Sequence, residues 1–267
     1  EPWLAWCSFP DPHHPMTPPE PWFSRHDPAD MVLPDSFDAP EADTPAHLER
    51  LRSTPSKANE NFWVLPFGPT ADEARAAIAV TYGMVEAIDD GIGQILDTLE
   101  RLDLADDTII VFTSDHGDMM GDHRLMVKGA FFYDACVNVP LIIHWPEQLA
   151  PGKKIQTPVQ NFDLAATILQ AAGMSSEECS KLLSESLNML DAVADESSAR
   201  EYVTCRYRNT GIRRGNRSWD PEIQGTMIRD KRWKLCYYHT TDEGELYDMM
   251  NDPDELNNQW NNPEFQT

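Results

Sequence analysis

The sequence predicts an α/β domain followed by a smaller antiparallel β subdomain. The first observation is an order of patterns between residues 72 and 172: a helix, a buried strand, a second strand and a second helix, which is typical of α/β packing. The second is a change of texture after residue 198, where strand-like segments become short, β-branched or aromatic, and separated by turns. We therefore expect two domains, residues 1–197 and residues 198–267.

Two amphipathic helices are expected in the first domain. Thr70 can cap a helix over residues 72–102, in which apolar residues from Ile78 to Leu102 recur at steps of three and four. A second helix is expected over residues 162–172, and Gly173 ends it. Each helix should bury one face against the sheet.

The strands of both domains are predicted from apolar runs. Residues 108–112 form a continuous apolar segment, which predicts a strand buried on both faces, and residues 139–144 form a second one. In the second domain, residues 201–205, 225–229 and 233–238 alternate with turns and are expected to pair as an antiparallel sheet.

The first seventy residues have a different composition. Residues 1–9 are expected to form a buried strand, and because a mature protein rarely begins inside its own core, we interpret the chain as a fragment. Residues 10–70 are rich in Pro, Asp and Ser, which predicts long surface loops with one short helix near His47 to Arg52. Long loops in a compact enzyme commonly border a substrate cleft, and a linker is the alternative.

Composition excludes several classes of function. The chain has 267 residues, of which 41% are hydrophobic, so a sizeable core is expected. Its net charge of −24 disfavours nucleic acid as a partner, because phosphates attract Lys and Arg. No apolar run approaches the length of a membrane span. The five cysteines are odd in number and include no Cys-x-x-Cys pair, which argues against a disulfide framework.

The segment that follows the first predicted strand carries the densest set of reactive side chains. Asp115, His116, His123 and Lys128 all lie in this stretch. In an open α/β sheet, loops leaving the carboxyl ends of strands bind ligands. A carboxylate beside an imidazole is a natural half-site for a divalent metal, so this stretch points to a hydrolase.

Four stretches together resemble the sulfatase family of the alkaline phosphatase superfamily, closest to the branch with phosphonate monoesterases and carbohydrate or choline sulfatases. The match follows the order of the family and spans nearly the whole chain. The four stretches are Asp11 to Pro15; Tyr82 to Gly93 with Asp89; Ser114 to Gly117 with Gly121 to His123, Lys128 and Val139 to Leu141; and Glu245 to Asp248 with Asn251 to Pro253. The resemblance implies an alkaline phosphatase-like sandwich of a mainly parallel sheet with helices.

The resemblance also implies a metal centre. Asp115 and His116 would be ligands of a divalent metal, calcium first and manganese as the alternative. A hard carboxylate suits calcium, whereas an imidazole beside it favours a transition metal. The competing interpretation is that Asp115 caps the next turn and His116 is a surface histidine.

Three further residues are implied to act on the ester. His13 would protonate the leaving oxygen, a task for a group that titrates near neutrality; the adjacent His14 is the competing candidate. Lys128 would be a fixed cation on the sulfuryl oxygens, against a solvated loop lysine. His123 would form a wall of the active site or simply brace the loop.

Two weaker features complete the set of candidates. Arg213, Arg214 and Arg217 form a basic cluster that either lines the cleft against an anionic sugar or lies in a solvated turn. Asp89 and Asp90 are expected to have a structural role in their helix.

The sequence departs from the family at the nucleophile. The family uses the cysteine of Cys-x-Pro-Ser-Arg, converted to formylglycine, and Cys7 is followed by Ser8-Phe9-Pro10 instead. The paired aspartates that complete the metal site are absent as well. Both belong to an N-terminal portion in the family. The chain is therefore interpreted as a piece of a longer product, as a subunit completed by another chain, or as a piece that folds poorly alone.

The leading hypothesis is hydrolysis of a sulfate ester of a carbohydrate, choline or an aryl alcohol, with the formylglycine supplied by the missing N-terminal portion. The alternatives are a phosphonate or phosphate ester hydrolase and a catalytically silent module that binds an anionic carbohydrate. A homo-oligomer stays open. The free cysteines favour the cytoplasm, while periplasmic or secreted locations also stay open, since many sulfatases are exported.

Overall fold

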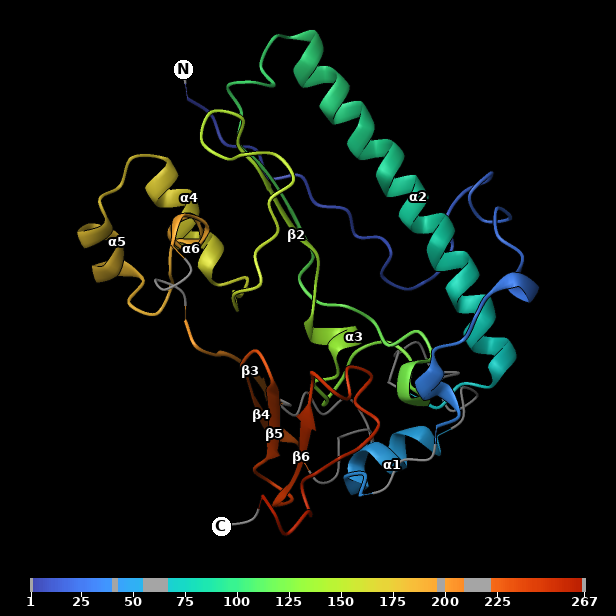
Figure 1. Cartoon of the computed structure of the whole chain (residues 1–267). Helices are drawn as coiled ribbons and strands as arrows, with labels where there is room; N and C mark the ends of the chain where they lie inside the picture. Colours follow the sequence, from blue (N-terminus) through green and yellow to red (C-terminus); the bar gives the residue numbers. More distant parts are fainter. Residues whose placement is uncertain (1, 40–42, 55–66, 196–199, 209–221, 266–267) are drawn as a thin grey trace. The chain divides into compact units, whose positions relative to one another are not determined.

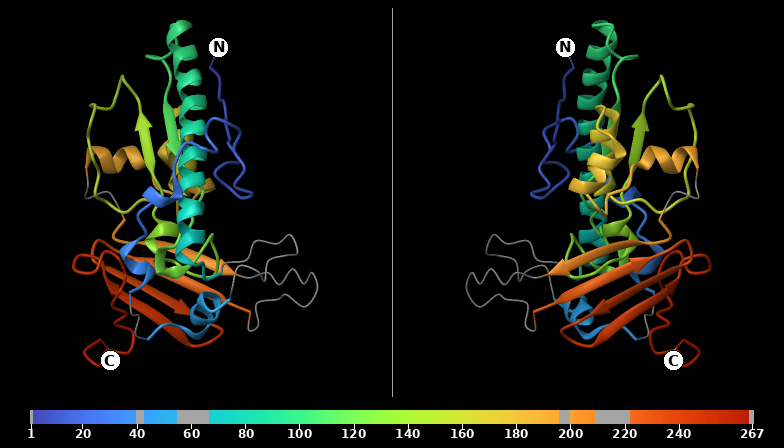
Figure 2. Two further views of the ribbon diagram at one scale, coloured as in Figure 1. Left: turned by 90° about the vertical axis from the view of Figure 1, so that its right-hand side faces the viewer. Right: turned by 90° about the vertical axis from the view of Figure 1, so that its left-hand side faces the viewer.

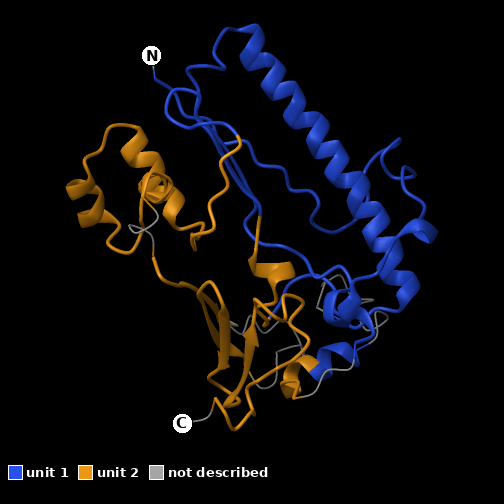
Figure 3. Ribbon diagram, in the orientation of Figure 1, with its two compact units in different colours: residues 1–39, 49–129, 140–151 blue, residues 40–48, 130–139, 152–267 orange. Residues whose placement is uncertain are grey.

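A computed structural model describes residues 2–39, 43–54, 67–195, 200–208 and 222–265 (Figure 1). The chain forms two compact units that interleave in sequence (Figure 3). Unit 1 comprises residues 1–39, 49–129 and 140–151, and unit 2 comprises residues 40–48, 130–139 and 152–267. The predicted domain boundary at residue 198 stays a prediction.

Helix α2 (Ala71–Arg101) is the longest element of unit 1 (Figure 1). It begins with a capping box: the Glu73 amide donates to Thr70 Oγ1 at 3.3 Å, and the Thr70 amide donates to the Glu73 carboxylate at 2.8 Å. Its buried face includes Ala74, Ile78 and Met84. The predicted helix over residues 72–102 and its Thr70 cap are confirmed.

Gly83 lets the N-terminal loops approach this helix closely. A Cβ atom at Gly83 would lie 2.1 Å from the carbonyl oxygen of Trp22, a distance that no side chain tolerates. The neighbouring loop is further fixed by Glu86, whose carboxylate contacts His26 Nε2 at 3.1 Å and Arg25 Nε at 2.6 Å. Helix α2 thus contacts and fixes one side of the segment that follows His13 and His14.

The remaining short elements before α2 lie in the loops, as predicted. They are the 3₁₀ turns η1 (Pro28–Asp30) and η2 (Asp35–Phe37) and helix α1 (Ala46–Arg52). Helix α1 confirms the short helix predicted near His47 to Arg52. The buried strand predicted over residues 1–9 is wrong for the described part: residues 2–9 form neither helix nor strand, and their side chains are exposed.

Strands β1 (Ile110–Thr113) and β2 (Leu141–His144) pair with each other in unit 1. The pair is antiparallel, with Ile110 opposite His144. No parallel pairing occurs within the described residues, and the mainly parallel sheet of the family fold stays a prediction. The first strand is not buried on both faces, because Phe112 is 39% exposed. An apolar run shows which faces can be buried, but it does not show that the covering segment lies in the same chain.

Unit 2 begins with short helices. They are α3 (Asp134–Val137), α4 (Asp163–Ala171), α5 (Ser176–Leu182) and α6 (Met189–Ala194). Helix α4 confirms the helix predicted over residues 162–172, and Gly173 follows it with φ +97°. The sequence analysis did not predict α5 and α6.

The four C-terminal strands form one antiparallel sheet in the order β3-β4-β5-β6 (Figure 2). Their bounds are Val203–Arg208, Gln224–Arg229, Trp233–Tyr238 and Glu243–Asp248. The predicted antiparallel sheet is confirmed, and β6 is a further strand that the apolar pattern did not show. The structure is thus a mixed α/β fold with an antiparallel C-terminal sheet.

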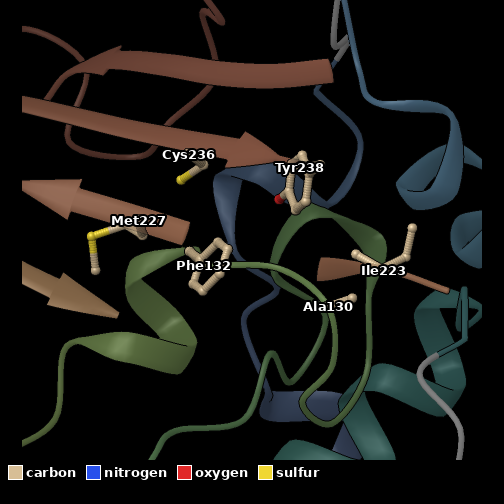
Figure 4. Close-up of a cluster of buried hydrophobic side chains, with 6 residues drawn as sticks. All are labelled: Ala130, Phe132, Ile223, Met227, Cys236 and Tyr238. Atoms are coloured by element: carbon tan, nitrogen blue, oxygen red, sulfur yellow. The ribbon is translucent and has the colours of Figure 1, made fainter. Parts of the chain in front are cut away.

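The core of unit 2 combines an apolar cluster with a buried polar network. The cluster consists of Ala130, Phe132, Ile223, Met227, Cys236 and Tyr238 (Figure 4). Beside it, the fully buried Lys234 ammonium contacts Asp134 at 2.6 Å and Glu255 at 2.7 Å. Burial lowers the pKa of Lys234, but Glu255 and Asp134 outweigh this effect and raise it. The lysine therefore stays charged in the core.

No helix of the described residues has the length and apolar character needed to cross a membrane. All five cysteines are free thiols, with Cys7 exposed.

Candidate active site

The segment from Ser114 to Lys128 is a hydrogen-bonded loop in unit 1. The Met119 amide donates to the Val127 carbonyl at 3.0 Å, and the Gly121 amide donates to the Leu125 carbonyl at 2.9 Å. The first bond brings Asp118 and Lys128 to the same end of the loop. The loop is anchored because the side chains of Met119, Leu125, Met126 and Val127 are buried. A rigid loop can hold a charged side chain in one place.

The loop contains an unusual amount of left-handed backbone. Gly121 turns the chain at φ +99°, where glycine is favoured. Val127 has φ +57° although it is β-branched, a conformation that costs free energy and is found mostly at functional sites. Since Val127 directly precedes Lys128, the strained residue fixes the direction in which the lysine leaves the loop.

Asp115 and His116 lie side by side at the start of the loop. The His116 amide donates to Asp115 Oδ1 at 2.9 Å, and His116 Nε2 lies 3.6 Å from Asp115 Oδ2. The Ser114 hydroxyl donates to the His116 carbonyl at 2.8 Å and fixes the turn. The Asp115 side chain is 85% exposed. Both interpretations retain support, because Asp115 caps the local turn while presenting an oxygen to solvent.

The described residues do not by themselves form a complete metal cage. Nowhere in the described ranges do three or more His, Cys, Asp or Glu side chains gather as a metal site. Calcium takes six to eight oxygen ligands, so one carboxylate and one imidazole do not suffice. Asp115 and His116 thus fit half of a divalent site.

His13 and His14 stack against each other in the loop that follows residue 10. Their ring centroids are 3.8 Å apart, and His13 Nδ1 lies 2.7 Å from the His14 carbonyl oxygen. Burial, followed by the positive charges of His13 and Lys128, lowers the pKa of His14 to about 4. The influence of Lys128 agrees with a position of His14 near this lysine, although the two are more than a hundred residues apart in sequence.

Asp118 belongs to the same group of charges. Burial raises the pKa of the Asp118 carboxyl, while the positive charges of Lys128, His116 and His13 oppose the rise. These couplings join the loop that carries His13 to the loop that carries Lys128. The structure therefore brings together the predicted residues His13, His116 and Lys128.

Three buried polar atoms in this group have no hydrogen-bond partner among the described residues. They are Lys128 Nζ, His14 Nδ1 and Asp118 Oδ1. Buried polar groups in native proteins are nearly always hydrogen-bonded, so such atoms point to a bound partner. An ammonium beside an imidazole suits an anionic group.

His123 is placed differently from the other predicted residues. It is buried, its amide donates to the Ser36 hydroxyl at 2.9 Å, and its carbonyl accepts from Arg52 Nε at 2.8 Å. These contacts agree with a residue that braces the loop. A role for His123 as a wall of the active site stays a prediction.

Two neighbours join the predicted residues in this group. The sequence offers His14 only as an alternative to His13, and it predicts no role for Asp118. A signal existed for Asp118, since it lies three residues after Asp115 in the same loop. Its position near Lys128 depends on the turn register, which residue types alone do not specify. The basic cluster Arg213, Arg214 and Arg217 lies outside the described residues.

Comparison with known proteins identifies the family of the chain. Residues 1–174 match the family model "Sulfatase", and residues 121–267 match "N-sulphoglucosamine sulphohydrolase, C-terminal". The chain belongs to the sulfatase family, within the alkaline phosphatase superfamily.

Three relatives show how much of the family fold is represented. A choline-sulfatase of Rhizobium meliloti (strain 1021) is 29% identical over 262 residues, which cover 98% of this chain and 47% of the relative. A solved structure described as a complex with its substrate D-glucosamine-2-N,6-O-disulfate is 28% identical, with a TM-score of 0.62, and the match covers 73% of this chain and 38% of that one. A phosphonate monoester hydrolase from Silicibacter pomeroyi is 25% identical, with a TM-score of 0.75 over 95% of this chain and 51% of that one.

The chain thus spans about half the length of the curated relatives it matches, or less.

Proposed function

We propose that this chain forms the C-terminal part of a formylglycine-dependent sulfatase that hydrolyses a sulfate ester of a carbohydrate, choline or an aryl alcohol. Membership of the sulfatase family supports the reaction class. The similarity to a choline-sulfatase and to a structure bound to a sulfated glucosamine supports this range of substrates.

The observation that carries the proposal is the unpartnered Lys128 ammonium, buried beside His13 and His14. A fixed cation at this place stabilises the negative charge on the sulfuryl oxygens as the ester bond breaks. His13, which is exposed at the edge of the group, supplies the proton to the leaving oxygen. His14 remains neutral near neutral pH, because its pKa is lowered to about 4, and it can donate or accept one hydrogen bond to the ester.

Asp115 and His116 would hold the divalent cation together with ligands from the rest of the protein. We propose calcium first, because the carboxylate is a hard ligand, with manganese as the alternative, because the imidazole favours a transition metal. When bound, such a cation acts as a Lewis acid toward the ester and the nucleophile.

The nucleophile itself is proposed to come from the missing N-terminal portion of the catalytic domain. The exposed apolar side chains of unit 1 support a covering partner of this kind. They include Trp3, Leu4 and Trp6 near the start of the described chain, Phe112 on β1 and Ile142 on β2. If these side chains belong to one contiguous surface, a further segment of the protein would be suited to cover it.

A phosphonate monoester hydrolase is the second candidate. The similarity to the Silicibacter pomeroyi enzyme supports it, and a lysine with two histidines can serve a phosphonate oxygen as well as a sulfate oxygen. A silent anion-binding module is the candidate outside enzymes, since this chain lacks the Cys-x-Pro-Ser-Arg motif.

Measurements of turnover and binding with the complete protein distinguish these three candidate functions. Turnover of an aryl sulfate should exceed turnover of the matching aryl phosphonate ester, measured as kcat/KM with the same leaving group. Phosphonate turnover far above sulfate turnover would replace the first candidate by the second. Absence of turnover for both esters, together with retained sulfate binding in calorimetry, would favour the silent module.

A further inference from the structure

We propose that Asp118 sets the charge preference of the anion site: its carboxylate offsets the Lys128 ammonium, so that singly charged esters are favoured over doubly charged ones. The inference rests on the proposed function, because it assumes that Lys128 faces the ester. It assigns a specificity role to a residue that forms no part of the predicted site.

The loop register carries the first step. The Met119 amide bonds to the Val127 carbonyl, and the Gly121 amide bonds to the Leu125 carbonyl. The first of these bonds joins the residue after Asp118 to the residue before Lys128, so it brings Asp118 and Lys128 to the same end of the loop. The electrostatic influence of Lys128 on the Asp118 carboxyl agrees with this closeness. The backbone of the loop therefore keeps the two charges together.

The second step is that Lys128 Nζ and Asp118 Oδ1 do not hydrogen-bond to each other. Lys128 Nζ and Asp118 Oδ1 are both buried, and neither has a hydrogen-bond partner among the described residues. The carboxylate thus reduces the positive potential at the site, while the ammonium keeps its donors available for an anion. A closed ion pair would instead have occupied those donors.

The third step is the balance of charge around the bound group. Lys128 contributes one positive charge and Asp118 one negative charge, and Asp115 adds a further carboxylate nearby. His14 is neutral, because its pKa lies at about 4, whereas His13 and His116 complete the set of neighbouring titratable groups. A cation held at Asp115 and His116 would add the same positive charge for every ester, so the contribution that distinguishes a singly from a doubly charged ester here is the negative charge of Asp118 beside Lys128.

Sulfate and phosphate monoesters differ in charge, so the charge of Asp118 affects their binding differently. A sulfate monoester carries one negative charge at pH 8, whereas a phosphate monoester carries nearly two, since its second pKa is about 6. Asp118 repels each negative charge of the bound ester, so a phosphate monoester is repelled more strongly than a sulfate monoester. At a separation of several ångströms in a protein environment, this repulsion is worth about tenfold in affinity or more.

The test compares two esters with the same leaving group on the complete protein. Asp118→Asn should raise the ratio of kcat/KM for the aryl phosphate to that for the aryl sulfate about tenfold at pH 8. Asp118→Glu keeps the charge and should leave the ratio within about twofold. Asp106→Asn removes an exposed carboxylate just before β1 and serves as the matched control.

A second readout does not depend on turnover. Calorimetric binding of phenyl phosphate and phenyl sulfate should show the same change of ratio in Asp118→Asn. If the wild-type protein hydrolyses neither ester but the binding ratio changes, the proposed function fails and the role of Asp118 stands.

Three outcomes would overturn the inference. The first is an unchanged ratio in folded Asp118→Asn protein, and the second is an equal change in the Asp106→Asn control. The third is that neither Asp118→Asn nor Asp118→Ser folds, as judged by circular dichroism, because the carboxylate would then be required for the loop itself.

Discussion

Two adjacent histidines have different environments in this protein, and the difference supports different proposed roles for them. His13 is exposed, whereas the pKa of His14 is lowered to about 4 by burial and by the charges of His13 and Lys128. A pKa of about 4 leaves His14 almost entirely unprotonated near neutral pH and therefore a poor proton donor, which favours His13 as the proposed acid. The sequence alone left this choice open, because burial is a property of the fold.

The role of His13 predicts a dependence on the leaving group. In the complete protein, His13→Asn should lower kcat/KM about 100-fold or more for an alkyl sulfate, whose leaving oxygen needs a proton. For a nitrophenyl sulfate the loss should stay below about tenfold, since that leaving group departs as an anion. Steady-state kinetics on the two esters measure the difference, and His144→Asn, at an exposed position of β2, is the control. Equal losses for both esters would contradict a role in protonation.

The lowered pKa of His14 predicts a pH dependence of stability. Between pH 6.5 and about 4, the unfolded chain binds a proton at His14 that the folded protein does not. The free energy of unfolding therefore falls as the pH falls through this window, and the full contribution is present above pH 6.5. Allowing for the partial exposure of the ring, we expect His14→Gln to lose about 1 kcal/mol less than wild type between pH 7.5 and pH 5.

Urea denaturation of both proteins at the two pH values measures this difference. The many carboxylates of the chain change the free energy of unfolding with pH equally in both proteins. Only the difference between wild type and His14→Gln therefore reports on His14. Identical losses in wild type and His14→Gln would show that the histidine titrates normally in the folded protein.

At the level of elements, the loop from Ser114 to Lys128 shows what a sequence pattern can and cannot predict. The apolar segment before the loop and the chemistry of Asp115, His116 and Lys128 were visible in the sequence. The closeness of Asp118 to Lys128 was not visible in the sequence, because it depends on the hydrogen bonds of Met119 and Gly121 and on left-handed residues such as Val127. Residue types specify the chemistry of a loop, whereas the turn register specifies which side chains meet.

Helix α2 offers a prediction with an internal control. Gly83→Ala would place a methyl group 2.1 Å from the Trp22 carbonyl oxygen, so the neighbouring loop must move, and we expect a loss of about 1–3 kcal/mol. Gly93→Ala, in the same helix, meets nothing within 4 Å and should gain about 0.5–1 kcal/mol. Urea denaturation measures both changes. A stabilising effect of Gly83→Ala would contradict the close contact.

At the level of the whole molecule, the local patterns predicted elements better than their partners. The helices at residues 71–101 and 163–171 and the antiparallel C-terminal sheet are as expected. The buried strand expected over residues 1–9 was wrong, since Trp3, Leu4 and Trp6 are exposed. Apolar composition indicates that a segment is suited to burial, but the residues that bury it are set by the tertiary fold.

The same reasoning applies to the catalytic group as a whole. The described residues include a lysine whose Nζ has no hydrogen-bond partner among them, two histidines whose rings lie against each other, and the adjacent Asp115 and His116, all within unit 1. These residues come from two loops that are about a hundred residues apart in the sequence. Local patterns do not predict that the two loops meet, whereas the family resemblance does. The central claim is that this group binds the sulfuryl oxygens through Lys128.

The most direct measurement of this claim is the kcat/KM for an aryl sulfate of the complete protein with Lys128→Gln, beside Lys154→Gln at an exposed position. If Lys128 stabilises the developing charge, its replacement lowers kcat/KM by about 100- to 1000-fold, whereas Lys154→Gln leaves it within about twofold. A folded Lys128→Gln protein that retains wild-type kcat/KM would contradict the account.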